Sequence, residues 1–151
     1  GRMDKKALLV ITDGEDNKSS YTLDEVLDRL RNANLTLYAI GLLEENDLRG
    51  GLFRKSPSQR ARKALEEIAE VTGGEAFFPK NLGGVNELCR QVALNLRNHY
   101  TIGYNPSNRN LDGTWRNVEV EVNAPRGFPK LSVRTKPGYR APNGKSAFQD
   151  R

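Results

Sequence analysis

Three acidic side chains follow directly on an apolar run near the start of the chain. Residues 8–11 are Leu-Leu-Val-Ile, and Asp13, Glu15 and Asp16 come next. In open α/β sheets ligands bind beyond the carboxyl ends of the strands, and clustered carboxylate oxygens suit a hard cation such as Mg²⁺ or Ca²⁺. Aspartate and glycine are also common turn residues. The residue types alone therefore leave a cation site and a simple polar loop both open.

Periodicity predicts the elements that would position these acids. Residues 7–12 are continuously apolar, which predicts a strand buried on both faces. Thr22 and Glu25 have the spacing of a capping box and open a helix. A second buried strand is predicted over residues 35–42. A strand, a helix and a strand with short joints form a βαβ unit, so we expect parallel pairing with a right-handed crossover.

The α/β pattern continues for two more helices. Pro57 opens a helix with apolar residues on one side, and Gly73 ends it, because glycine accepts the left-handed conformation that a helix end needs. A short strand is predicted over residues 75–78 and a third helix over residues 85–98. The fold class is therefore α/β: a partial Rossmann-like parallel sheet with flanking helices.

The pattern changes near Tyr100. Residues 100–106 predict a strand, and residues 118–122 and 131–134 alternate apolar with polar side chains, which indicates strands with one wet face. We therefore expect an antiparallel β addition after the parallel sheet. The predicted division of the chain is an α/β unit over residues 5–99, an antiparallel extension over 100–142 and a disordered tail over 143–151.

Composition excludes several classes of protein. The chain has 151 residues, a net charge of +5 and a single cysteine, which rules out a disulfide framework and a cysteine metal cluster. No apolar run approaches the length of a membrane span. Arg54, Lys55 and Arg60 are candidate anion contacts, but acidic and basic residues are mixed along the chain, so a solvated surface is favoured over nucleic-acid binding.

The stretch KALLVITDGEDNKS resembles the fourth-strand segment of von Willebrand factor type A domains. The later stretches LTLYAIGL, LEEIAEVTGGEAFF and HYTIGYNP follow in the order found in the acidobacterial subgroup of these domains. The resemblance covers residues 5–142. It implies that Asp13 is a ligand of a metal-ion-dependent adhesion site, and that Thr12 and Gly14 form the turn that holds it.

The resemblance also implies that this site is incomplete. The family's site takes further ligands from an Asp-x-Ser-x-Ser loop after the first strand, and no such sequence precedes Asp13. A divalent cation takes about six oxygens, so we expect Mg²⁺ or another divalent cation to bind weakly or not at all to this chain alone. The chain then corresponds to the C-terminal half of the family's domain.

In the family another strand lies beside the segment Leu8, Leu9, Val10 and Ile11. Without that neighbour these four residues form an edge of unpaired amides, and such an edge invites pairing with another chain. We expect either self-association into a homo-oligomer or completion by a separate chain that carries the first half of the domain.

Three functions follow as hypotheses. The first is a non-enzymatic protein-binding or adhesion module, with the extracytoplasmic or secreted location that the resemblance suggests. The second is a magnesium-dependent phosphotransfer enzyme with Asp13 as nucleophile, but the later strand ends carry no lysine or hydroxyl partner. The third is a structural assembly element that needs no metal.

Overall fold

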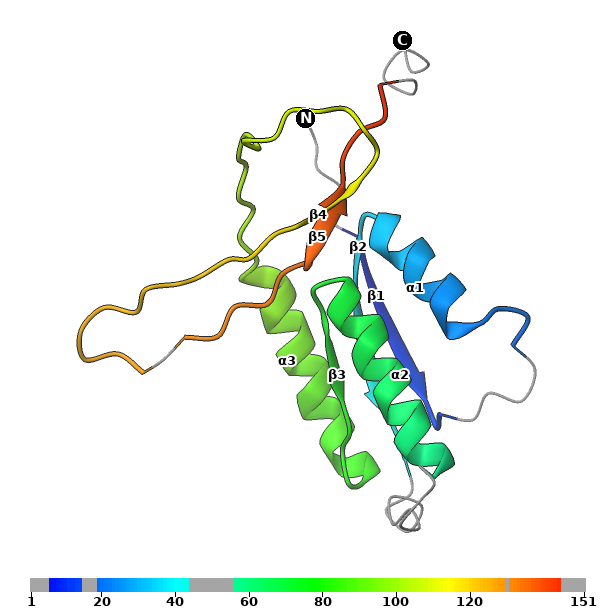
Figure 1. Ribbon diagram of the computed structural model, residues 1–151. Helices are drawn as coiled ribbons and strands as arrows, with labels where there is room; N and C mark the ends of the chain where they lie inside the picture. Colours follow the sequence, from blue (N-terminus) through cyan, green and yellow to red (C-terminus); the bar gives the residue numbers. More distant parts are fainter. Residues whose placement is uncertain (1–5, 15–18, 44–55, 130, 145–151) are drawn as a thin grey trace.

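The computed structural model describes residues 6–14, 19–43, 56–129 and 131–144. It confirms an α/β unit followed by a separate antiparallel β extension (Figure 1). Its elements, in chain order, are β1 (Lys6–Thr12), α1 (Leu23–Asn32), β2 (Leu35–Gly41), α2 (Pro57–Val71), β3 (Glu75–Phe77), the 3-10 turn η2 (Leu82–Gly84), α3 (Val85–Arg97), β4 (Trp115–Asn117) and β5 (Gly138–Arg140).

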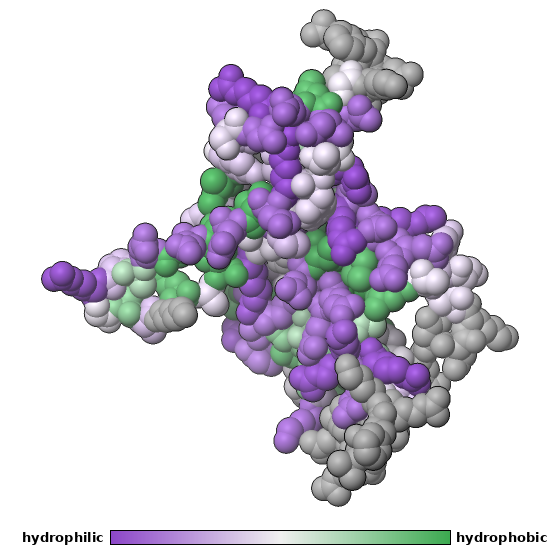
Figure 2. All heavy atoms as spheres, viewed as in Figure 1, coloured by the Kyte–Doolittle hydropathy of each residue, from purple (hydrophilic) through white to green (hydrophobic). Residues whose placement is uncertain are grey.

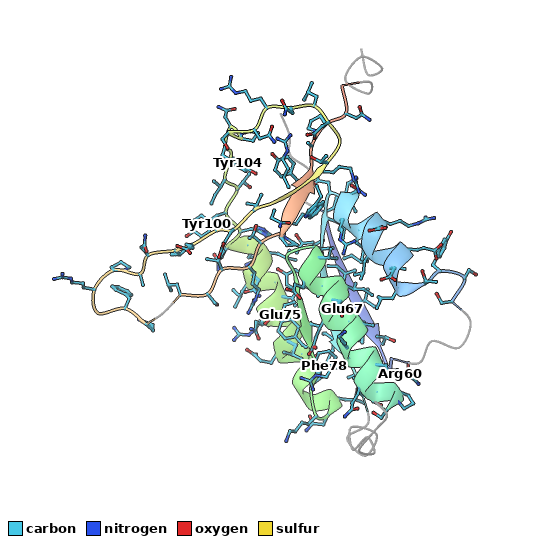
Figure 3. The ribbon with its side chains drawn as sticks, viewed as in Figure 1. Arg60, Glu67, Glu75, Phe78, Tyr100 and Tyr104 are labelled. Carbon is cyan, nitrogen blue, oxygen red and sulfur yellow. The ribbon has the colours of Figure 1, made fainter. Side chains whose placement is uncertain are left out.

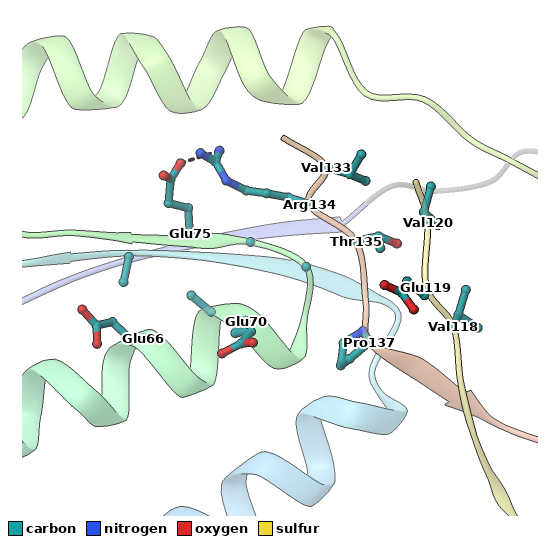
Figure 4. Close-up of a pocket in the computed structure, with 14 residues that line it drawn as sticks. Glu66, Glu70, Glu75, Val118, Glu119, Val120, Val133, Arg134, Thr135 and Pro137 are labelled. Atoms are coloured by element: carbon teal, nitrogen blue, oxygen red, sulfur yellow. Dashed lines mark ion pairs between the residues drawn. The ribbon is translucent and has the colours of Figure 1, made fainter. Parts of the chain in front are cut away.

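The first sheet has the order β1-β2-β3, and both neighbouring pairs are parallel, as the βαβ pattern predicts. Helices α1 and α2 lie on one side of this sheet and α3 lies on the other (Figure 4). The core is centred on β2, where Tyr38, Ala39 and Ile40 are buried, and on the side of α2 that carries Ala69. The middle strand is therefore covered on both faces.

Local sequence signals explain where the helices begin. The Thr22 hydroxyl accepts from the Glu25 amide, and the Glu25 carboxylate accepts from the Thr22 amide at 2.8 Å, so the predicted capping box is present. The same arrangement joins Ser56 and Gln59 at the start of α2. Each box satisfies two amides that the first helical turn leaves without partners.

The glycine pair after α2 lets the chain turn into β3 beside the sheet. Gly73 has a φ of +75°, and its amide donates to the Glu70 carbonyl while the Gly74 amide donates to Ala69. A Cβ on Gly74 would lie 1.8 Å from the Leu37 carbonyl oxygen. Glycine is required here because the helix end packs directly on the backbone of β2.

The antiparallel extension is present, but its strands differ from the predicted ones. Trp115–Asn117 pairs with Gly138–Arg140, whereas residues 100–106, 118–122 and 131–134 contain no strand. The Val118 amide donates to Pro137 and adds one rung. Alternation predicts only which face of a strand would be apolar, whereas a strand also needs a hydrogen-bonded neighbour. Residues 118–122 and 131–134 are not paired with each other, so neither segment forms a strand.

Consequently the segments 118–129 and 131–135 project from the body of the molecule and expose apolar side chains (Figures 1 and 2). Val122, Phe128, Leu131 and Val133 are all exposed. A turn closes the far end, where the Phe128 amide donates to Pro125 and Gly127 has a φ of +88°.

Basic side chains hold the extension against the α/β unit. The Lys136 ammonium donates to the Ala33 carbonyl at the end of α1, and burial lowers the pKa of this lysine. Arg140 donates to the Asn32 side chain at 3.4 Å. These contacts place cations at the C-terminal end of a helix, where the helix dipole favours them.

The end of the extension continues beyond the predicted boundary at Pro142. Asn143 forms an isolated bridge with Asp112, and the Gly144 amide donates to the Leu111 carbonyl at 3.2 Å. Residues 145–151, the rest of the predicted tail, lie outside the described residues.

Candidate functional site at the end and edge of strand β1

The turn after β1 is built by three consecutive residues. The Thr12 hydroxyl accepts from the Gly14 amide at 3.0 Å, and Gly14 has a φ of +84°. A Cβ on Gly14 would lie 2.6 Å from the Leu43 side chain and 2.9 Å from that of Ala61. Glycine thus serves both the backbone conformation and the close approach to α2. Asp13, between these two residues, is exposed at the tip of the strand.

The described residues do not make up a metal shell. Within them no group of three or more histidine, cysteine, aspartate or glutamate side chains could hold a metal ion. Asp13 is the one predicted ligand that the structure describes, because Glu15 and Asp16 lie outside the described residues. A single carboxylate falls short of the six or so oxygens that Mg²⁺ or Ca²⁺ requires.

The outer edge of β1 is not paired by any described residue. The Thr12 carbonyl accepts from the Leu42 amide at 2.8 Å, so the backbone groups of Thr12 point toward β2. In a parallel ladder alternate residues point to opposite sides. The backbone N–H and C=O groups of Ala7, Leu9 and Ile11 are therefore directed at the open edge.

The hydrogen bonds of β2 support this assignment of the β1 backbone groups to the outer edge. The Leu37 amide points away from β1. It donates a hydrogen bond of 2.9 Å to the hydroxyl of Thr72, which lies between α2 and β3. Leu37 pairs in register with Leu8, and Tyr38 with Leu9. Odd-numbered residues of β2 thus bond away from β1, as the alternation requires.

The apolar side chains of β1 are exposed on both of its faces. Leu8 is 46% exposed, Leu9 39% and Ile11 52%, while Val10 is partly buried. The sequence prediction of a strand buried on both faces is therefore wrong for β1. A side chain on an edge strand has a cross-strand neighbour on one flank only, so apolar composition by itself does not produce burial.

The faces of β1 follow from its register with β2. A Cβ on Gly41 would lie 3.1 Å from the Leu65 side chain of α2, so this position faces the α1 and α2 layer. Thr12 pairs with Gly41 and shares that face, together with Leu8 and Val10. Leu9 and Ile11 lie on the face of α3, but α3 runs beside β3, away from β1 (Figure 1).

The predicted anion contacts are only partly described. Arg60 is exposed on the first turn of α2 and is labelled together with Phe78 in Figure 3. The Phe78 ring is covered by Arg62 instead, whose guanidinium carbon lies 4.5 Å from the ring centroid. Arg54 and Lys55 lie outside the described residues, so the structure does not bring the three predicted cations together.

A groove that the sequence analysis missed lies where the extension meets the sheet (Figure 4). Its volume is about 470 Å³, and its walls carry Glu66, Glu70 and Glu119. Arg134 crosses it to form an ion pair with Glu75 at 2.6 Å. These residues come from α2, β3 and two separate parts of the extension, so no spacing in the sequence could have indicated the groove.

The aromatic residues pack the extension only in part. Tyr104 and Tyr139 contact each other edge to face with centroids 6.4 Å apart, and Trp115 lies against Gly138. Tyr100 is 88% exposed. The contacts of Tyr104, Tyr139 and Trp115 thus join parts of the extension to one another.

These features define an α/β domain with a parallel sheet and an aspartate at a strand end. A family model for the von Willebrand factor type A domain matches residues 2–91, and the chain belongs to this family. Such domains are generally protein-interaction modules and typically bind a divalent metal. No curated protein matches the chain significantly.

Among solved structures, the chain is similar to an uncharacterized membrane spanning protein from Vibrio fischeri, with 19% sequence identity and a TM-score of 0.47. The match covers 60% of this chain and 46% of that one, so this chain spans less than half of that protein's length. In this chain, none of the helices within the described residues is long and apolar enough to cross a bilayer.

Proposed function

We propose that the chain is a non-enzymatic protein-binding module, and that the open edge of β1 is its binding surface. One observation carries the proposal. A strand of seven residues presents, on one side, backbone groups that no described residue pairs, and it exposes the Leu8, Leu9 and Ile11 side chains on both faces. An exposed edge of this kind is a template for a strand from another polypeptide.

Binding at this edge would take place by strand addition. The N–H and C=O groups of Ala7, Leu9 and Ile11 would bond the added strand, which supplies affinity without regard to sequence. The half-exposed leucine and isoleucine side chains would select a partner with apolar residues at alternate positions. Family membership supports a role in protein interaction.

Asp13 gives the surface a metal-dependent component in this proposal. It lies directly beyond the edge, on a turn fixed by Thr12 and Gly14. A partner that pairs with β1 would bring its own oxygen ligands to the same end of the sheet. Mg²⁺ or another divalent cation would then bind the complex more tightly than either chain.

Calorimetry tests the metal component. Mn²⁺ or Mg²⁺ is titrated into the chain alone, and into its mixture with a polypeptide that carries the first strand and Asp-x-Ser-x-Ser loop of a von Willebrand factor type A domain. We expect binding heat in the mixture only, and its loss with Asp13→Asn. Tight 1:1 binding by the chain alone would contradict an incomplete shell.

Hydrogen exchange tests the edge itself. We expect the amides of Ala7, Leu9 and Ile11 to exchange rapidly in the monomeric chain and slowly once a strand is added at the edge, while those of Leu8 and Val10 stay protected in both. Equal protection of all five amides in the monomeric chain would mean that the edge is already covered, and the proposal would fail.

We also propose an extracytoplasmic or secreted location, by resemblance to the adhesion-type members of the family. Accessibility of the protein to protease added to intact cells tests this location, and full protection until the cells are lysed would exclude it.

A further inference from the structure

We propose that the strand added at the β1 edge is β1 of a second copy, paired antiparallel about a two-fold axis that passes beside Val10. The inference rests on the proposed function, because it names the partner of the same surface. It follows from which backbone groups of β1 have no pairing partner among the described residues, which side chains are exposed, and how the charges at the two ends of the strand are placed.

The direction of pairing follows from symmetry. A two-fold axis that joins two sheets through antiparallel edge strands stands perpendicular to the combined sheet. The sheet faces that carry α3 in the two copies therefore form one continuous face. Residues directly opposite each other must then share a face. Leu9 can therefore lie opposite Leu9 or Ile11 of the second copy, but not opposite Val10.

The exposed side chains select between these registers. With the axis beside Val10, Leu9 lies opposite Ile11 of the second copy and exchanges both backbone hydrogen bonds with it, and the reverse pair repeats by symmetry. Leu9 and Ile11 are large, apolar and exposed, and such pairs stabilise antiparallel strands. The register centred on Leu9 would instead place Ile11 opposite Ala7, which leaves more apolar surface exposed.

Charge favours the same arrangement. Lys6 begins the strand and Asp13 follows it, and both are exposed. In the antiparallel register Asp13 lies opposite Ala7 of the second copy, one position from its Lys6, so opposite charges approach at both ends. A parallel register would place Lys6 beside Lys6 and Asp13 beside Asp13, and like charges directly opposite each other are destabilising.

The same pairing also covers the other face of the strand. Leu8, which lies on the α1 and α2 side, comes opposite Thr12 of the second copy, and Val10 comes opposite itself. The result is a continuous six-stranded sheet with β1 at its centre in both copies. It would supply partners for the backbone groups of Ala7, Leu9 and Ile11, which no described residue pairs.

Sedimentation of the full chain across micromolar concentrations is the first part of the test. We expect a dimer, and we expect Ile11→Lys to weaken dimerisation by about tenfold or more, because symmetry removes each cross-strand pair twice. Asn86→Ala, exposed on α3, which runs beside β3 and away from β1, is the matched control and should leave the association unchanged.

A pair of proline variants tests the backbone assignment. Leu9→Pro removes an N–H that only the second copy would use, so the chain should remain folded and become monomeric. Leu8→Pro removes an N–H that bonds β2, so it should lower the thermal stability of the chain itself. If Leu9→Pro also unfolds the chain, Ile11→Lys still tests the dimer.

Disulfide formation fixes the register. In a Cys89→Ser background, Val10→Cys should give a disulfide-linked dimer under mild oxidation, because opposed residues of a non-hydrogen-bonded antiparallel pair lie about 4.5 Å apart between Cα atoms. Leu8→Cys should not form this disulfide, because Leu8 lies opposite Thr12 of the second copy, four residues away from Leu8 of that copy. Faster linkage through Leu9→Cys than through Val10→Cys would overturn the register.

The outcomes separate the partner from the binding surface. A monomer with rapidly exchanging Ala7, Leu9 and Ile11 amides would overturn the second copy as partner and leave the edge open for another polypeptide. A monomer with those amides protected would overturn both proposals. A dimer that forms equally well with Ile11→Lys and gives no Val10→Cys linkage would show that another surface mediates it.

Discussion

Strands β1 and β2 are neighbours of equal length with opposite environments. Each has seven residues, and both are rich in leucine, isoleucine and other apolar side chains. In β2 the last five residues are buried, whereas most of β1 is exposed. The two sequences are similar enough that each predicts a buried strand. Composition therefore indicates that a segment is a strand, but not how many neighbours the strand has.

The difference arises from what surrounds each strand. β2 has a hydrogen-bonded neighbour on each flank, α2 packs on one face, and Thr72 reaches across to the Leu37 amide. β1 has one described neighbour, and α3 lies away from it. The buried strand stabilises the fold, and the exposed one is left available for interaction. Four predictions test how far this contrast holds.

The largest effect is expected from a charge placed at equivalent points of the two strands. Ile40, which is fully buried, pairs in register with Ile11. Ile40→Asp should cost about 4 kcal/mol or more of unfolding free energy, because it buries an unpaired carboxylate. Ile11→Asp should cost about 1 kcal/mol or less at its exposed position. Urea denaturation followed by circular dichroism measures both, and equal losses would contradict the contrast.

Two threonine hydroxyls allow a subtler comparison. Thr72 is buried and accepts from the Leu37 amide, whereas Thr12 is half-buried and accepts from the Gly14 amide. Thr72→Val should cost about 1–3 kcal/mol, because the Leu37 amide would lose its partner inside the core. Thr12→Val should cost about 1 kcal/mol or less, since water can reach the turn. Chemical denaturation of the two variants decides whether burial sets the cost.

Two glycines with positive φ test whether the turn after β1 is a packed structure. Gly14 lies against Leu43 and Ala61, whereas nothing lies within 4 Å of the Cβ position of Gly127. Gly127→Ala should cost about 1 kcal/mol for the backbone conformation alone. Gly14→Ala should cost about 1 kcal/mol more than that, because of the added crowding. Equal thermal shifts would mean that the turn is not held against α2.

The smallest effect on stability is expected at the start of α1, the helix between the two strands, and this effect depends on pH. Hydrogen bonds from the Thr22 backbone and hydroxyl lower the pKa of Glu25 below its ordinary value near 4.5. A lowered folded-state pKa stabilises the fold above pH 4.5, and that contribution is lost as the pH falls through the folded value. Glu25→Gln should therefore lose less stability than the wild type between pH 5 and pH 3, as thermal melts at each pH would show.

The parallel sheet and the extension differ in how well the sequence predicted them. Residues 6–97 follow the predicted order of strands and helices closely, because each boundary carries a local signal: the Thr22 and Glu25 box, the proline at Pro57, the glycine at Gly73. The extension carries only alternation and turn residues. Alternation does not specify a partner, and so the paired segments turned out to be Trp115–Asn117 and Gly138–Arg140.

The candidate site likewise has a part that the sequence predicted and a part that it did not. The acidic turn after the first strand was expected from the residue pattern, and the roles of Thr12 and Gly14 in it from the family resemblance, because both depend on a short contiguous stretch of sequence. The acidic groove that Arg134 crosses was not, because its walls come from segments far apart in the chain. Glu15 and Asp16, which the sequence groups with Asp13, lie outside the described residues.

By itself the sequence determined the type of each element in the α/β unit, the parallel direction of its first two strands, and an aspartate at the end of the first. These depend on residue spacing and on capping, which act over a few positions. Only the tertiary structure decided that β1 is exposed while β2 is buried, and that the backbone groups of Leu9 rather than Leu8 point at the open edge. Burial and hydrogen-bond direction depend on which neighbours a strand has, and those neighbours come from distant parts of the chain.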